Sequence, residues 1–121
     1  MKRLVKSFGY AFAGLWTAIK TERNLKIHPA VAVLVVILGL YLGLSALHWC
    51  LVVFAIGFVL VSELFNTSVE RLSDEIGNGK QSSSIKAVKD ISAAAVLFSA
   101  LTALVIGIFV LVIPLIQRLI V

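Results

Sequence analysis

Three carboxylates and one amide recur at helical spacing near the end of a long apolar stretch. Glu63, Asn66, Glu70 and Asp74 are separated by 3, 4 and 4 residues, which places all four on one face of an α-helix. Ionisable side chains are costly in a membrane helix and usually mark a functional site. This row of polar side chains is therefore the first candidate for a reactive site.

The chemistry that these residue types favour is phosphoryl transfer. Carboxylate oxygens suit Mg²⁺, which typically takes one or two carboxylates together with substrate phosphates, and lysine or arginine suits the phosphates. Glu22 and Asp90 supply two further acids, and Lys89 and Arg3 supply cations. A carboxylate near the membrane boundary, as expected for Glu63, is a candidate general base for a hydroxyl.

Each of these side chains also has a structural interpretation. The four polar side chains of the row could support helix packing or lie solvated at the membrane surface. The Lys89–Asp90 pair could belong to the first turn of a helix. The segment Gly77-Asn-Gly-Lys80 lacks the spacing of a P-loop, and the sequence contains no His-Glu-x-x-His motif. The convergence of the set, more than any single residue, supports the functional interpretation.

The composition places the chain among membrane proteins. It has 121 residues, of which 60% are hydrophobic and 14% charged, and its mean hydropathy is +1.07. Soluble domains are usually about 45–50% apolar and about 25% charged. The net charge of +5 comes from basic residues that flank apolar segments, which indicates membrane topology and anionic headgroups and argues against a nucleic-acid partner.

The apolar segments predict an all-α integral membrane protein with a single domain over residues 1–121. Residues 2–20 carry an apolar stripe at helical spacing, which predicts an amphipathic helix on the membrane surface. Three further segments are expected to cross the membrane, residues 29–47, 49–74 and 86–117.

The connections between these helices are expected to be short. The segment 21–28 is polar, and Pro29 is expected in the first turn of the first membrane helix, where its missing N–H costs little. Residues 45–48 should form a tight turn, and residues 77–84 read as a loop by composition.

The basic residues also predict the orientation in the membrane. Ten lysines and arginines precede the first span or lie between the second and third, whereas Arg118 is the one on the opposite side. By the positive-inside rule, the N-terminus and the polar row face the cytoplasm and the C-terminus lies outside. Basic residues interrupt the first apolar stretch, so no cleavable signal peptide is expected.

Several motifs together resemble one family. They are Phe8-Gly-Tyr10-Ala-x-x-Gly14, Glu22-Arg-Asn-x-x-x-His28, Glu63-x-x-Asn66-Thr-Ser-Val-Glu70-x-x-x-Asp74 and Lys89-Asp90-x-x-Ala-Ala-Ala-Val96. This combination resembles the bacterial membrane lipid kinases, which comprise the prokaryotic diacylglycerol kinases and the undecaprenol kinases. The Glu-Arg-Asn-x-x-x-His form looks like the Gram-positive branch, whose members mainly phosphorylate undecaprenol.

The resemblance implies a homotrimer in the bacterial inner or plasma membrane, with three membrane helices and a surface helix per subunit. It implies ATP as co-substrate, Mg²⁺ as metal, and active sites shared between neighbouring subunits. Glu63 would be the general base and Asn66 would position it and the γ-phosphate, while Glu22 and Glu70 would hold metal. The remaining residues would contact ATP or its phosphates, namely Arg3, Tyr10, Asp74, Lys89 and Asp90.

Two alternatives stay open at this stage. The lipid acceptor could be diacylglycerol instead of undecaprenol, since sequence does not resolve acceptor bulk, and the loop at 77–85 departs from the diacylglycerol kinase pattern. A non-enzymatic role, as a cation conduit or an assembly partner, would also place carboxylates in a membrane. A conduit predicts acids spread through the bilayer depth, whereas here they cluster at one rim.

Overall fold

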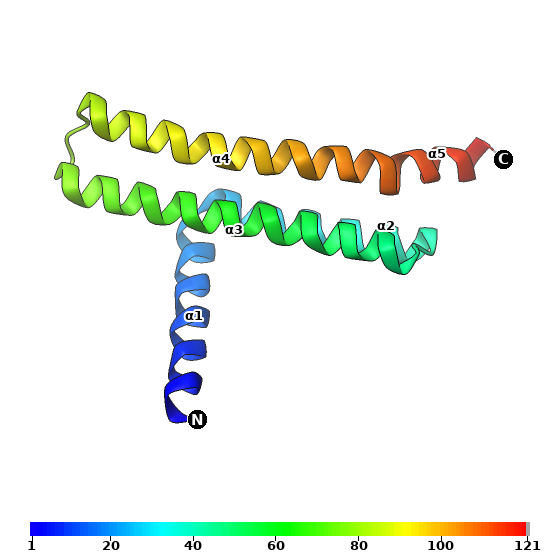
Figure 1. Cartoon of the computed structure of the whole chain (residues 1–121), viewed down its shortest axis with the longest axis horizontal. Helices are drawn as coiled ribbons and strands as arrows, with labels where there is room; N and C mark the ends of the chain where they lie inside the picture. Colours follow the sequence, from blue (N-terminus) through cyan, green and yellow to red (C-terminus); the bar gives the residue numbers. More distant parts are fainter. Residues whose placement is uncertain (121) are drawn as a thin grey trace.

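The computed structural model describes residues 1–120, in which every regular element is helical. Figure 1 shows three long helical rods lying side by side and a fourth helix, α1, that leaves them sideways. In chain order the elements are α1 (Lys2–Thr21), α2 (Arg23–Leu42), α3 (Ala46–Gly77), α4 (Ser83–Gly107), a π-helical turn (Ile108–Val112) and α5 (Ile113–Ile120).

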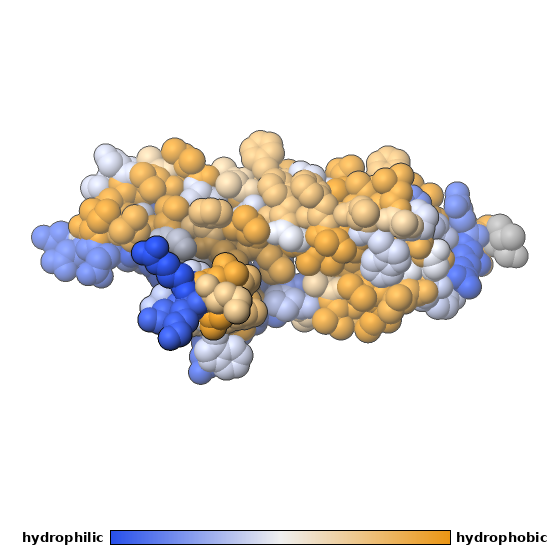
Figure 2. Space-filling view, turned by 60° about the horizontal axis from the view of Figure 1, so that its bottom comes forward, coloured by the Kyte–Doolittle hydropathy of each residue, from blue (hydrophilic) through white to orange (hydrophobic). Residues whose placement is uncertain are grey.

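Three helices are long and apolar enough to cross a membrane. They are α2, α3 and the continuous rod of α4, the π-helical turn and α5. Figure 2 shows hydrophobic surface over these rods and hydrophilic residues towards their two ends. The prediction of an all-α protein with three membrane-spanning helices is confirmed.

The turn between α2 and α3 lies slightly earlier than expected. Helix α2 ends at Leu42, and Gly43 adopts a left-handed conformation with φ of 67°, which glycine accepts without steric cost. Ser45 then caps α3, because its Oγ accepts the N–H of His48 at 3.3 Å. The tight turn expected at 45–48 therefore comprises residues 43–45, and His48 lies within α3.

The first connection is also shorter than expected. Glu22 alone is extended, with φ of −103° and ψ of 123°, while its N–H still bonds the carbonyl of Ala18 at 2.9 Å. Because Arg23 and its neighbours include good helix formers, α2 begins at Arg23 and not at Pro29. Pro29 consequently lies inside α2, and the prediction that it occupies the first turn is wrong.

The third membrane rod begins at Ser83, capped by Ser82, whose Oγ accepts the N–H of Ile85 at 3.2 Å. It is not one regular α-helix over 86–117 as expected. Proline lacks an N–H and its ring collides with the carbonyl four residues earlier, so Pro114 disturbs the preceding turn. The π-helical turn relieves this, with the N–H of Ile113 bonded to the carbonyl of Ile108.

The buried apolar core lies towards the end of the rods that carries the α2–α3 turn. It is built on Val52, Val110 and Leu111, with Trp49 packed against it. Helix α1 contacts α2 and α3 and buries Ala18, while Phe8, Phe12 and Trp16 are exposed. The core thus leaves the opposite end of the bundle, where α1 joins, for polar residues.

Candidate active site

Glu63 is a buried carboxylate on α3. Its residue surface is 3% exposed, and its Oε1 lies 2.9 Å from Nε2 of His28 on α2. A buried ionised group is strongly destabilising unless it is paired and hydrogen-bonded, and His28 supplies that partner. The sequence placed Glu63 at the membrane boundary, but it did not show that the chain would enclose it.

One turn further along α3, Asn66 bridges two helices. Its Nδ2 donates to Oε1 of Glu70 at 3.1 Å, and its Oδ1 accepts the hydroxyl of Ser92 on α4 at 2.7 Å. The Ser92 hydroxyl also lies 2.9 Å from the backbone carbonyl of Lys89. Asn66 and Glu70 are therefore held together, as their common face predicted, while Ser92 is a site residue that the motifs did not indicate.

The last member of the row reaches the start of α4. Lys89 donates through Nζ to Oδ1 of Asp74 at 2.5 Å, and its side chain is 27% exposed. Asp90 instead pairs with Lys86 on its own helix. Lys89 thus lies beside the row, where it could release the Asp74 carboxylate and bind a phosphate. Asp90 instead belongs to the exposed ion pair with Lys86.

The junction between α1 and α2 brings Glu22 to the side of α3. Oε1 of Glu22 lies 3.8 Å from the guanidinium of Arg71, which also donates to the hydroxyl of Thr21. From the sequence, Arg71 was only one of the ten basic residues that predict the orientation in the membrane. In the structure Arg71, which directly follows Glu70 on α3, joins α3 to the Glu22 segment.

A groove of about 490 Å³ lies between α1 and α3, lined in part by Tyr10, Thr67, Ser68 and Arg71. Tyr10 lines this groove from α1, and its side chain is exposed. Arg3 lies near the free end of α1 (Figure 1), and among residues 1–120 its guanidinium makes no ion pair. A single chain therefore places Tyr10 close to the α3 surface but does not bring Arg3 to the row.

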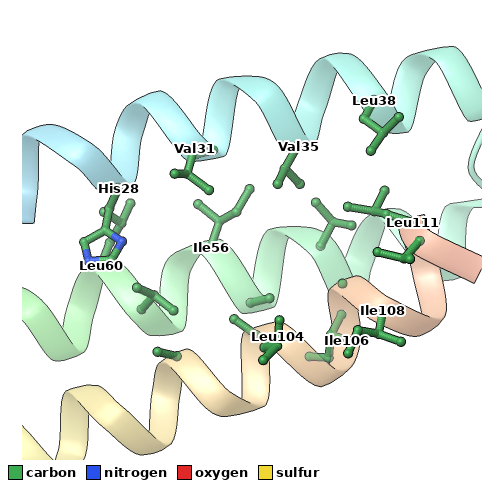
Figure 3. A pocket seen from close by; sticks show the side chains of 18 residues that line it. His28, Val31, Val35, Leu38, Ile56, Leu60, Leu104, Ile106, Ile108 and Leu111 are labelled. Atoms are coloured by element: carbon green, nitrogen blue, oxygen red, sulfur yellow. The ribbon is translucent and has the colours of Figure 1, made fainter. Parts of the chain in front are cut away.

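An apolar cavity of about 410 Å³ runs between α2, α3 and α4. Figure 3 shows His28 at one end, next to Leu60, and Leu38, Ile108 and Leu111 towards the other. His28 is the one polar side chain among the residues that line it, and Glu63 is not among them. The cavity suits a hydrocarbon chain whose polar end reaches His28.

The acidic side chains of the site could supply only part of the ligand shell that Mg²⁺ requires. Within residues 1–120, no three histidine, cysteine or acidic side chains form a group that could hold a metal ion alone. Mg²⁺ needs only one or two carboxylates when waters and substrate phosphates complete its shell. Glu22 and Glu70 each offer one carboxylate of this kind, and their shared role as metal ligands stays a prediction.

These observations define an apolar cavity that ends at His28, which contacts the buried Glu63, followed by a row of polar side chains on α3. A model of the prokaryotic diacylglycerol kinase family matches residues 9–111. The chain belongs to this family, and it is a lipid kinase, an enzyme that transfers a phosphoryl group from ATP to a membrane lipid.

Three relatives are similar over most of the chain. An undecaprenol kinase from Bacillus subtilis (strain 168) is 36% identical over 91% of this chain and 89% of its own. A diacylglycerol kinase from Synechocystis sp., a longer protein, is 33% identical over 94% of this chain and 65% of its own. A diacylglycerol kinase from Escherichia coli (strain K12) is 28% identical over 85% and 84%.

Proposed function

We propose that this protein transfers the γ-phosphoryl group of ATP to the hydroxyl of undecaprenol, giving undecaprenyl phosphate. The observation that carries the proposal is the His28–Glu63 pair at the end of an apolar cavity, one helical turn from the Asn66–Glu70 pair. An apolar acceptor enters from the bilayer, and the nucleotide approaches from the polar end. The two substrates then meet beside Glu63.

In this mechanism each residue has a separate task. Glu63 supplies the basicity that removes the hydroxyl proton, and its burial keeps competing water away. Asn66 orients the γ-phosphate, because its amide is fixed by Glu70 and Ser92. Phosphoryl transfer depends mainly on such positioning and on electrostatic stabilisation.

The charged residues serve the nucleotide. Glu22 and Glu70 would hold Mg²⁺, which would neutralise negative charge on the ATP phosphates. Lys89 exchanges its contact with Asp74 for a phosphate oxygen, and Arg71, beside Glu22, balances charge at the same edge. The residues proposed to line the remainder of the nucleotide site are Arg3, Tyr10, Asp74 and Asp90.

Undecaprenol is preferred as the acceptor for two reasons. The relative named for undecaprenol is 36% identical to this chain, against 33% and 28% for the two diacylglycerol kinases described above. The cavity is lined by aliphatic side chains apart from His28, and an isoprenoid alcohol carries one hydroxyl and no ester oxygens. Diacylglycerol is the second candidate, since two of these relatives are named for it.

The proposed assembly in the membrane rests on the family resemblance, on the charge distribution and on the exposed surface of α1. The aromatic side chains of α1, including Phe8, Phe12 and Trp16, need an apolar covering, which the membrane interface provides while Lys2 and Lys6 face headgroups. We place the N-terminus and the site on the cytoplasmic side and the C-terminus outside. The functional unit is a homotrimer, in which a neighbouring α1 completes each site.

The testing experiment measures ADP formation by purified protein in mixed micelles with ATP and Mg²⁺. Undecaprenol and diacylglycerol are supplied in separate reactions, with the Glu63→Gln variant as the matched control. A higher kcat/KM for undecaprenol, lost in the variant, supports the proposal. Preference for diacylglycerol overturns the acceptor assignment, and transfer to neither lipid by folded protein overturns the kinase mechanism.

A further inference from the structure

We infer that His28 is a catalytic residue which carries the proton from the lipid hydroxyl to Glu63. The inference rests on the proposed function and refines it. Glu63 remains the final proton acceptor, but the imidazole of His28 is the group that contacts the lipid hydroxyl. Its first support is position. His28 lines the apolar cavity and Glu63 does not, so a hydroxyl that arrives through the cavity meets the imidazole first.

The second support is the protonation state that the contact requires. An ionised carboxylate only accepts hydrogen bonds. When Glu63 is ionised, as its role as the base requires, the 2.9 Å contact between Nε2 of His28 and Oε1 of Glu63 needs the imidazole proton on Nε2. The neutral ring then has a bare lone pair on Nδ1.

The third support is that Nδ1 is free to act. In the part of the chain that the structure describes, residues 1–120, the hydrogen bonds of the His28 ring are limited to the one between Nε2 and Glu63. The His28 side chain is 28% exposed, whereas that of Glu63 is 4% exposed. The partly exposed imidazole is thus joined to an enclosed carboxylate, an arrangement in which the carboxylate orients the imidazole.

The proton transfers balance as follows. The lipid O–H bond breaks and its proton binds Nδ1, while the proton of Nε2 moves to Oε1 of Glu63. The lipid oxygen uses the freed electron pair to attack the γ-phosphorus of ATP, and the bond between that phosphorus and ADP breaks, with its electron pair leaving on ADP. Afterwards Nδ1 loses its proton to water and Glu63 returns its proton to Nε2. One proton is released per lipid phosphorylated, and both residues recover their starting states.

Two substitutions of His28 separate proton transfer from simple positioning. His28→Gln keeps a side-chain amide that can donate to Glu63 but cannot accept a proton. His28→Ala removes the ring and leaves space for free imidazole. We expect both variants to lose about 10²–10⁴-fold in kcat, the usual contribution of a general base, with a much smaller change in KM for the lipid. Added imidazole is expected to restore part of the kcat of His28→Ala and none of that of His28→Gln.

The matched control is His48→Gln, the same substitution near the start of α3, at the other end of the rods, which should behave as the native protein with and without imidazole. The inference is overturned if His28→Gln retains kcat within about threefold of the native protein, or if imidazole does not raise the kcat of His28→Ala. Failure of the native protein to phosphorylate either lipid would instead overturn the proposed function. An inactive Glu63→Gln beside an active His28→Gln would overturn this inference alone.

Discussion

The hydroxyl of Ser92 on α4 donates to the amide oxygen of Asn66 on α3 across 2.7 Å. The Glu70 carboxylate sets the direction of this amide, because it accepts from the Asn66 nitrogen at 3.1 Å. The flipped amide would place two acceptors, Oδ1 and the Glu70 carboxylate, against each other. With the direction set in this way, the α4 hydroxyl holds the amide oxygen and limits rotation of the Asn66 side chain.

Removing this hydroxyl should reduce activity without unfolding the protein. Ser92→Ala frees the amide of Asn66 to rotate, and a hydrogen bond of this kind contributes about 1 kcal/mol. We expect kcat to fall by about fivefold to tenfold. Initial rates with saturating lipid and ATP measure the change.

Ser99→Ala is the matched control on the same helix. The Ser99 hydroxyl donates to the carbonyl of Val96 at 2.8 Å, so it supports no site residue, and its loss should leave kcat unchanged. Equal reductions in the two variants would show that the loss comes from α4 packing and not from the orientation of Asn66.

Glu63→Gln separates the basicity of this residue from its shape. Glutamine preserves the volume and a hydrogen bond to His28, but it cannot take up a proton at neutral pH. We expect turnover to fall by about 10²–10⁴-fold. Because a buried neutral amide costs less to desolvate than a carboxylate, thermal unfolding in detergent should not occur at a lower temperature.

Glu75→Gln provides the comparison for this variant. Glu75 lies on α3 and is exposed, so it should retain native activity. Near-normal turnover by Glu63→Gln would remove Glu63 from the mechanism, whatever its effect on stability.

Lys89→Met tests whether the ion pair with Asp74 is kept for the nucleotide. The carboxylate of Asp74 is 67% exposed, and such surface pairs contribute little to stability. We therefore expect an unchanged unfolding temperature together with a loss of about tenfold to a hundredfold in kcat/KM for ATP, typical of a lost charge-assisted contact.

Lys86→Met is the control, because Lys86 lies one turn earlier on α4 and pairs with Asp90. It removes the same charge from the same exposed end of the bundle and should change kcat/KM for ATP little. If both variants lose activity equally, the effect reflects the general positive potential and Lys89 has no specific contact with phosphate.

The sequence predicted the helical row because helical periodicity follows directly from spacing. Glu63, Asn66 and Glu70 do share one face of α3, and the long apolar segments do form helices. Spacing could not show what meets that face from other helices, so the contacts from His28 and Ser92 emerged only from the packing of α2 and α4 on α3. The role of Arg71 was missed for the same reason.

Local backbone chemistry explains the boundaries that sequence reading placed wrongly. A polar composition over 21–28 indicated a linker, yet one extended residue, Glu22, turns the chain from the sideways α1 into α2 and leaves the rest helical. Pro114 interrupts the regular hydrogen bonding of the third span, yet the chain absorbs it through a π-helical turn and continues to Ile120. Composition identifies disruptive residues, but the surrounding hydrogen bonds decide how far each disruption extends.

Shared active sites predict complementation between two inactive variants. Arg3 lies near the free end of α1 and makes no ion pair within residues 1–120 (Figure 1), so it would serve a neighbouring subunit's site. A Glu63→Gln chain retains Arg3, and an Arg3→Glu chain retains Glu63. In a mixed trimer, some sites therefore contain both native residues.

Co-expression of the two chains should give more activity than the sum of the chains expressed separately, and crosslinking in lipid should give species up to three subunits. Chains purified apart and mixed without subunit exchange serve as the control and should show no gain. If each site were built within one chain, every site in the mixture would carry one defect. The co-expressed sample would then show no gain, and the proposed sharing of sites between subunits would be wrong.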